Sequence, residues 1–157
     1  MDLRTKGFTL LELLIALAIV LVIVSLAVPA FSRSVQIAKA DADLDELQRG
    51  LNFARLEAIN RGTAIQIRPL AGNDDWSGGL SIAQGGGALT NVLRVVPAMS
   101  SGATLTLTSG VTAIEYNNFG GLSSPATEVQ ISYALGAQSR VLNLCLNGRI
   151  QRGGNCG

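Results

Sequence analysis

The chain has 157 residues, the length of one ordinary domain, and its formal net charge at pH 7 is only +1. A nearly neutral chain has no global electrostatic attraction for nucleic acid. It contains no histidine, which excludes Ser-His-Asp and Cys-His catalysis and removes the commonest zinc ligand, so we expect no enzyme, no metal site and no cofactor.

An apolar run from Leu13 to Phe31 carries no charge and has Ser25 as its only polar side chain. At about 1.5 Å per residue, a helix of this length spans roughly 28 Å, close to the hydrocarbon thickness of a bilayer. The run therefore favours a membrane helix. A secretory signal peptide is the alternative, but the run outlasts a typical signal core of roughly 7 to 15 residues and lacks a convincing small-x-small cleavage site.

Glu12 lies at the start of this apolar segment, where an unpaired acidic side chain costs roughly 2.5 to 3.5 kcal/mol on insertion scales. Cleavage after Gly7 would create an α-amine at Phe8, one helical turn from Glu12. Two opposite charges about 4 Å apart attract by roughly 4 kcal/mol at an effective dielectric near 20, which offsets that cost. We therefore expect Glu12 to pair with this amine, within one chain or between neighbouring subunits.

Residues 6–12 read Lys-Gly-Phe-Thr-Leu-Leu-Glu, which resembles the class III signal of type IV pilins and type II secretion pseudopilins. The resemblance implies that a prepilin peptidase cuts after Gly7, that Phe8 becomes the N-methylated first residue, and that Glu12 aids assembly into a filament. It also implies a prepilin leader at residues 1–7 and a transmembrane and filament-core helix at residues 8–31.

Apolar residues then recur at alternating steps of three and four, which predicts one stripe on an α-helix. A coiled coil is the alternative, but the alanines leave its seam thin. We expect an amphipathic helix at residues 32–62, with Gly62 as its C-cap and its stripe buried against a sheet. The stripe consists of Ile37, Ala40, Leu44, Leu47, Leu51, Ala54 and Ala58, and the solvated side carries Asp41, Asp43, Asp45, Glu46, Gln48, Asn52 and Arg55.

Beyond Gly62 the apolar period changes to two, which predicts a β-rich head at residues 63–157. The first two strands should form a hairpin around turn residues 71–75. The fold class is α+β: a long N-terminal helix, transmembrane in its first half and amphipathic in its second, packed on an antiparallel β-sheet head. The strands are expected at residues 63–68, 76–82, 92–96, 103–108, 111–116, 129–135 and 140–146.

Residues 54–65 are similar to the helix end of GspH/FimT-type minor pilins and pseudopilins, which share an Ala-Arg-x-Glu-Ala stretch running into a strand. The resemblance implies an inner-membrane protein with a periplasmic head, which joins other pilins or pseudopilins in a filament and can lie at the filament tip. We expect a minor pilin that primes or assembles a type IV pilus. A GspH-like minor pseudopilin of a type II secretion system is the alternative.

Cys145 and Cys156 are the only cysteines. A chain anchored by its N-terminus places both outside the cytoplasmic membrane, where disulfides form. Closing a loop of about ten residues would stabilise the fold by on the order of 3 kcal/mol. We expect a disulfide between them, and two free thiols are the alternative.

Arg140, Arg149 and Arg152 are the only charged residues from position 129 to the end, and arginine binds phosphate in a bidentate manner. FimT-type minor pilins implicated in DNA uptake carry a Gly-Arg-x-Arg motif in the tail, whereas residues 148–152 read Gly-Arg-Ile-Gln-Arg. On an extended strand this spacing puts the two arginines on opposite faces unless the tail turns. The alternatives are binding of double-stranded DNA, for natural transformation, and a solvated, disulfide-closed end strand.

Overall fold

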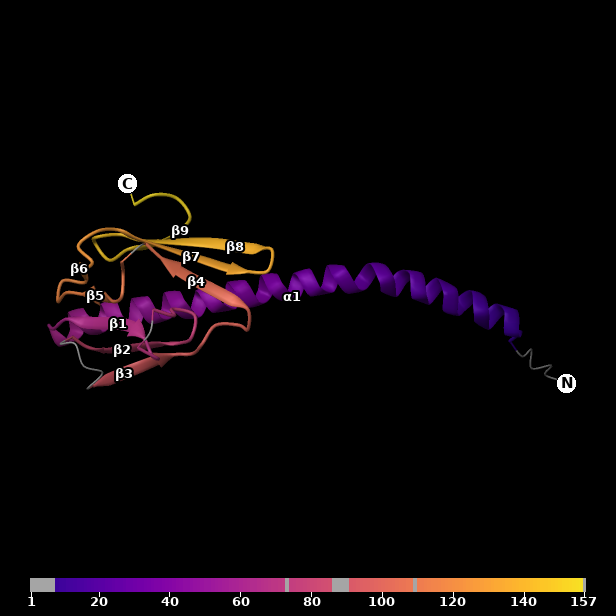
Figure 1. Cartoon of the computed structure of the whole chain (residues 1–157), viewed down its shortest axis with the longest axis horizontal. Coiled ribbons are helices and arrows are strands. Elements are labelled where there is room, and N and C mark those ends of the chain that lie inside the picture. The colour runs from indigo at the N-terminus through magenta and orange to yellow at the C-terminus, as the bar shows by residue number, and fades with distance from the viewer. Residues whose placement is uncertain (1–7, 73, 86–90, 109, 157) are drawn as a thin grey trace, which may run out of the picture. The chain divides into compact units, whose positions relative to one another are not determined.

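The computed structural model describes residues 8–72, 74–85, 91–108 and 110–156, and Figure 1 shows the order of its elements. The chain divides into two compact units, Met1–Gln36 and Ile37–Gly157. The helix α1 (Leu10–Arg61) runs through both.

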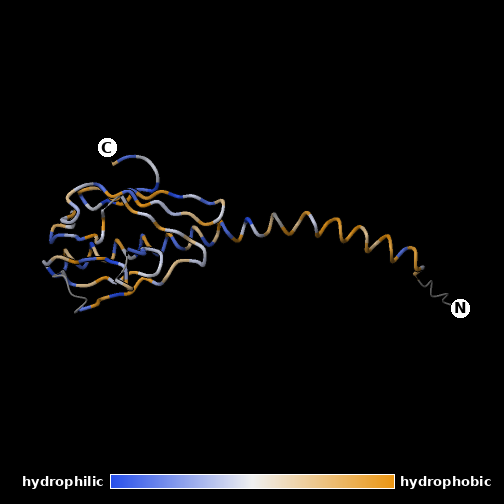
Figure 2. The backbone as a smooth tube through the Cα atoms, viewed as in Figure 1, coloured by the Kyte–Doolittle hydropathy of each residue, from blue (hydrophilic) through white to orange (hydrophobic). Residues whose placement is uncertain are grey.

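The first unit contains the N-terminal part of α1, in which every described side chain from Phe8 to Ser34 is exposed. A window in this helix has a mean hydropathy of 3.0, so by length and composition the helix can cross a membrane. Figure 2 shows the apolar residues along it. So large an uncovered apolar surface indicates contact with lipid or with other chains.

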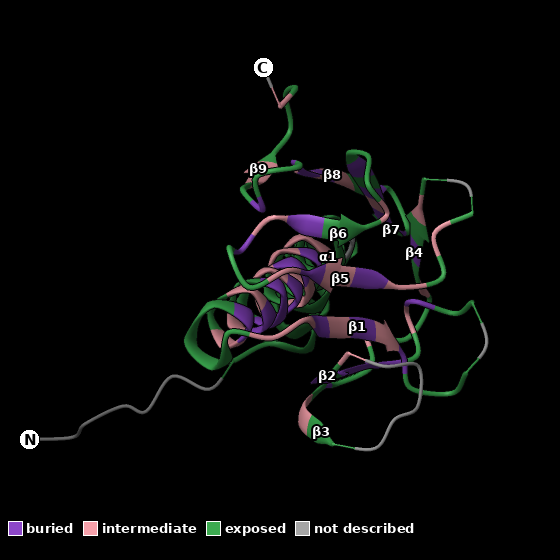
Figure 3. Cartoon of the chain, turned by 90° about the vertical axis from the view of Figure 1, so that its left-hand side faces the viewer, coloured by how far each residue is buried: buried purple, intermediate pink, exposed green. Residues whose placement is uncertain are grey.

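The second half of α1 buries the predicted stripe in the head. Ile37, its first member, is only half-buried. Seen along the helix, the strands lie around one side of α1, and its buried positions face them (Figure 3). The members that are at most 2% exposed are Ala40, Leu44, Leu47, Leu51, Ala54 and Ala58.

The C-terminus of α1 is capped as the sequence predicts. Gly62 follows the last helical residue with a φ of 63°, a left-handed conformation that glycine adopts without strain. The Gly62 N–H donates to the Ile59 carbonyl and the Thr63 N–H to the Ala58 carbonyl, each at 3.3 Å. This pair of bonds is the Schellman motif, which turns the chain from the helix into the first strand.

The described residues of the head form two antiparallel sheets. The first has the order β3-β2-β1-β5-β6 and the second β4-β7-β8-β9. As predicted, β1 and β2 form an antiparallel pair, with Ile67 opposite Ile82. The strands are β1 (Ile65–Pro69), β2 (Leu80–Gln84), β3 (Val92–Val96), β4 (Ala103–Leu107), β5 (Ile114–Tyr116), β6 (Leu122–Ser124), β7 (Val129–Leu135), β8 (Gln138–Leu144) and β9 (Ile150–Arg152).

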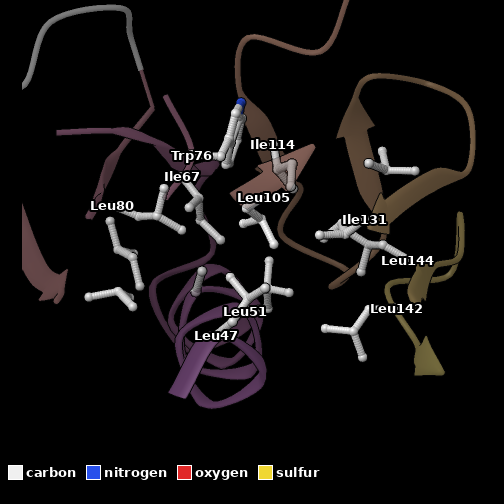
Figure 4. Close-up of a cluster of buried hydrophobic side chains, with 14 of the residues drawn as sticks. Leu47, Leu51, Ile67, Trp76, Leu80, Leu105, Ile114, Ile131, Leu142 and Leu144 are labelled. Carbon is white, nitrogen blue, oxygen red and sulfur yellow. The ribbon is translucent and has the colours of Figure 1, made fainter. Parts of the chain in front are cut away.

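One hydrophobic core joins α1 to both sheets. In Figure 4, Leu47 and Leu51 of α1 lie between residues of the first sheet and residues of the second. Burying a leucine or isoleucine side chain contributes roughly 1.5 to 3 kcal/mol, so this shared core holds the head together. The labelled partners of the two leucines include Ile67, Leu80 and Ile114 of the first sheet and Ile131, Leu142 and Leu144 of the second.

The structure corrects three expectations about the strands. The described residues of the head form two sheets, where the sequence predicts a single sheet, and they include the short strands β6 and β9, which the sequence pattern does not predict. Trp76, expected to open a strand, lies in the loop before β2, where it is only 4% exposed. Bulky aromatic residues are common in strands, so the sequence pattern favours a strand at Trp76, but here the side chain packs into the core from a loop.

Candidate functional site

The start of α1 organises the predicted assembly residues. Thr9 precedes the first helical residue, and its hydroxyl accepts a hydrogen bond of 3.2 Å from the Glu12 N–H. Thr9 is thus the N-cap, and Glu12 lies in the first turn, where the helix dipole favours a carboxylate. Phe8 is 87% exposed one residue before the cap. Gly7, the predicted cleavage site, lies outside the described residues.

Two of the three predicted DNA-binding arginines face α1. Arg140 on β8 forms an ion pair of 3.5 Å with Asp41. Arg152 on β9 forms an ion pair with Asp45. Its Nε also donates to the Gln48 side chain at 3.0 Å. The register of β8 and β9 pairs residue 152 with residue 142, so the two arginines are near neighbours on the sheet edge beside the helix.

The third arginine, Arg149, is exposed in the turn before β9. Its guanidinium lies beside the side-chain oxygen of Gln151 when that amide is turned to satisfy its hydrogen bonds. The structure therefore brings Arg140 and Arg152 together but engages both with carboxylates, and it leaves Arg149 on the surface. Asp41 and Asp45, which the sequence pattern places on the solvated side of the helix, therefore contact the second sheet.

Arg55, which the sequence pattern placed on the solvated side of the helix, connects α1 to two turns. Its Nε donates to the Gly120 carbonyl at 2.9 Å and its Nη2 to the Asn147 carbonyl at 3.1 Å. The turns touch each other, because a Cβ at Gly148 would lie 1.9 Å from the Gly120 oxygen. The Ala-Arg-x-Glu-Ala resemblance marked Arg55, but it did not indicate this contact.

Asp43 makes a second polar contact that the sequence pattern did not indicate. The Tyr133 hydroxyl on β7 donates to its carboxylate at 2.6 Å. Ser100 donates to the same carboxylate from its backbone N–H at 3.0 Å and from its hydroxyl at 3.1 Å. Burial, with a smaller contribution from Asp43, raises the pKa of Tyr133 above its ordinary value, which keeps this hydroxyl a donor.

Glu46 and Arg94 link β3 to α1 at 2.8 Å. Arg49 binds the other oxygen of the Glu46 carboxylate, also at 2.8 Å. The hydrogen bond from Arg49, assisted by Arg94, lowers the pKa of Glu46 below its ordinary value, although burial opposes the shift. The guanidinium carbon of Arg94 also lies 5.4 Å from the centre of the Phe53 ring, a cation–π geometry.

A disulfide joins Cys145 to Cys156, with the two Cα atoms 5.5 Å apart. The Asn143 side chain donates to the Gly154 carbonyl beside it. The bridge closes the segment that contains β9, so the last residues are held against β8. The part of the chain that the structure describes contains no cluster of histidine, cysteine or acidic residues able to hold a metal ion.

The chain matches two family models. The model of the type II transport protein GspH matches residues 43–149, and the prokaryotic N-terminal methylation motif matches residues 3–28. No curated protein sequence matches the chain significantly.

Solved structures of two minor subunits are similar. The type IV minor pilin FimU of Pseudomonas aeruginosa is 29% identical in one crystal form, with a TM-score of 0.67 over 74% of this chain and 90% of that chain. A second crystal form gives 30% identity and a TM-score of 0.62 over 73% and 92%. The minor pseudopilin EpsH of the Vibrio cholerae type 2 secretion system shares the fold at 16% identity, with a TM-score of 0.54 over 73% and 95%.

These matches agree with the architecture: a long N-terminal helix is packed on antiparallel sheets, and the methylation motif covers the start of its apolar half. The GspH model spans most of the head and the amphipathic part of α1. The chain belongs to the GspH family of minor pilins and pseudopilins.

Proposed function

We propose that the chain is a minor pilin of a type IV pilus, which helps to prime or assemble the filament. The observation that carries the proposal is its similarity to FimU, a type IV minor pilin, at 30% identity over 92% of that chain. The pseudopilin EpsH is 16% identical and supports a common fold alone. Other pilins of the filament are the expected partners.

The N-terminal residues have the roles that the resemblance implies. Prepilin peptidase cuts after Gly7 in the inner membrane, and Phe8 becomes the methylated first residue. Before assembly the apolar part of α1 anchors the chain, with the head in the periplasm. Glu12 then pairs with the Phe8 amine, and Thr9 supports this arrangement because its hydroxyl caps α1 at the Glu12 N–H.

Mass spectrometry of the mature protein and of sheared surface pili tests the proposal. We expect a chain that begins at methylated Phe8 and is present in the pili. Glu12→Gln should leave cleavage intact while reducing incorporation about tenfold, because an amide keeps the shape and loses the charge. An uncleaved chain, or pili that never contain it, would contradict the proposal.

A minor pseudopilin of a type II secretion system is the second candidate, and the GspH family model favours it. A deletion strain distinguishes the two systems. Loss of surface pili with normal secretion of exoproteins supports the pilin. Loss of exoprotein secretion with normal pili supports the pseudopilin.

DNA binding by Arg140, Arg149 and Arg152 stays a prediction. The three arginines lie on β8, on β9 and in the turn between these strands, which favours a common surface. The ion pairs with Asp41 and Asp45 count against it, because phosphate must displace a carboxylate to reach Arg140 or Arg152.

A further inference from the structure

Four large apolar side chains are exposed around the end of α1, and we name them the turn patch: Leu56, Ile59, Phe119 and Leu146. Phe119 is 85% exposed and the others 44% to 58%. Phe119 lies in the turn between β5 and β6, and Leu146 in the turn between β8 and β9. The core cluster of the head includes none of the four.

The elements that carry the turn patch are neighbours in space. A Cβ on Gly120, the residue after Phe119, would lie 2.7 Å from the Ile59 side chain. The Leu146 carbonyl accepts a hydrogen bond of 2.9 Å from the Leu122 N–H, which places the second turn beside the end of the first. Two turns and the last part of α1 therefore present one apolar surface.

The turn that carries Phe119 is held rigidly. The Asn117 side-chain oxygen accepts hydrogen bonds of 3.0 Å from the N–H groups of Phe119 and Gly121. The Asn117 N–H also donates to the Gly121 carbonyl, and the Gly120 N–H donates to the Asn117 carbonyl, each at 2.9 Å. Arg55 holds the Gly120 carbonyl from the helix.

A rigid turn that exposes an aromatic side chain is suited to binding a partner. The exposed ring gives the isolated head no burial energy, yet its backbone is already ordered. A partner that buries the ring therefore loses little conformational entropy on binding. Buried aromatic anchors of this kind provide much of the affinity of protein interfaces.

The charges at the turn patch select the kind of partner. The turns at residues 117–121 and 145–149 contain no acidic residue, and the acidic residue of α1 between Leu56 and Ile59, Glu57, is paired with Arg61. The basic groups at these turns are Arg149 and Arg55. Arg55 reaches them from α1, and its guanidinium binds one backbone carbonyl in each turn. A second copy that docked through the same patch would bring these like charges together, which opposes association. A partner whose apolar pocket has an acidic rim would attract them.

We propose that the turn patch docks a different subunit of the same filament, with Phe119 inserted into an apolar pocket rimmed by acidic residues. The inference rests on the proposed function for the class of partner, and it adds the surface and its anchor. Within the head, the patch lies roughly 30 Å along α1 from Ile37, beside the C-terminal end of the helix.

A photo-crosslinking residue at position 119 of the full chain, in cells that make the whole filament system, identifies the occupant. The control places the same residue at Leu70, which is 44% exposed outside the patch. We expect an adduct with another pilin subunit from position 119 and none from position 70. No adduct, an adduct with a second copy, or equal adducts from both positions would overturn the proposal.

Incorporation into filaments gives the quantitative test. Phe119→Ala should reduce incorporation at least tenfold, and Arg149→Gln should reduce it several-fold by weakening contact with the acidic rim. Leu70→Ala and Arg49→Gln are the matched controls and should leave it unchanged. Fluorescence of Trp76, the only tryptophan and a core residue, verifies that each variant is folded.

The same samples distinguish the two proposals. A chain that begins at methylated Phe8 and is incorporated equally well in wild type and Phe119→Ala overturns the surface alone. A wild-type chain that is never cleaved or incorporated overturns the proposed function and the docking surface with it.

Discussion

Tyr116 and Tyr133 are both fully buried, and only one of their hydroxyls has a hydrogen-bond partner in the described part of the chain. Tyr133 donates to Asp43, whereas the Tyr116 hydroxyl is unpaired there. Tyr133→Phe should lower the free energy of unfolding by about 2 kcal/mol, because it removes a hydrogen bond to a charged group. Tyr116→Phe is the matched control and should be neutral or stabilising. Urea titration of the full chain in detergent, followed by Trp76 fluorescence, measures both.

The same tyrosines predict how stability depends on pH. Burial is the main cause that raises the pKa of each above its ordinary value of 10.0. Above pH 10 the unfolded chain loses these protons while the folded chain keeps them, so the unfolding free energy falls as pH rises. The expected slope is about 1.4 kcal/mol per pH unit for each tyrosine. Each Tyr→Phe variant should reduce this slope by the contribution of the tyrosine that it removes. A slope that stays the same in both variants would show that the two tyrosines do not cause the pH dependence.

The hydrogen bonds of Arg55 to the two turns should also contribute measurably to the free energy of unfolding. Arg55→Ala removes two charge-assisted hydrogen bonds to turn carbonyls and should lower the unfolding free energy by about 2 to 3 kcal/mol. Arg49→Ala is the control, because Arg49 is 60% exposed in an ion pair with Glu46, worth about 0 to 1 kcal/mol. An equal decrease in the free energy of unfolding in both variants would show that the hydrogen bonds of Arg55 to the turns stabilise the fold no more than an exposed ion pair does.

The strands show what a single sequence reveals about elements. β3 and β7 have the predicted bounds, because clear apolar runs or alternation identify them. β6 and β9 have three residues each, too few to establish a period, and β9 reads Ile-Gln-Arg with a single apolar side chain. The disulfide and the pairing with β8 hold β9 in place, and no local pattern encodes the strand pairing.

β9 therefore depends on its covalent link. Reduction, or Cys156→Ser, should lower the unfolding free energy by about 3 kcal/mol for a loop of this size. Hydrogen exchange should accelerate at residues 150–152 while the β7 amides stay protected. Reduction should have no further effect on Cys156→Ser, which serves as the control. Unchanged exchange at β9 after reduction would mean that Arg152 and the strand pairing suffice.

At the scale of the whole molecule, one edge of α1 connects the helix to the second sheet and to one turn of each sheet. Asp41, Asp45 and Arg55 lie along it, and each contacts a residue more than 60 positions away in the sequence. The period of three and four predicted which face of the helix is buried. It could not predict which polar side chains at the border of that face find distant partners. For this reason the sequence alone does not distinguish DNA binding by the C-terminal arginines from a structural role.

Those ion pairs determine what DNA binding by the chain would require. Each phosphate contact contributes about −0.9 to the slope of log affinity against log salt for duplex DNA. Because Asp41 and Asp45 occupy Arg140 and Arg152, the wild-type full chain should show a slope of about −0.9 from Arg149 alone.

Releasing the two arginines gives the decisive comparison. In Asp41→Asn/Asp45→Asn the slope should approach about −2.7, since all three arginines can then contact phosphate. Asp74→Asn/Glu128→Gln raises the net charge equally at exposed positions that do not form the ion pairs of Arg140 and Arg152, so it separates local release from a general charge effect. A salt titration of the full chain in detergent against duplex DNA measures all three proteins. If the released variant does not bind at low salt, or binds only as the control does, the tail arginines hold the C-terminal strand to α1 and do not bind DNA.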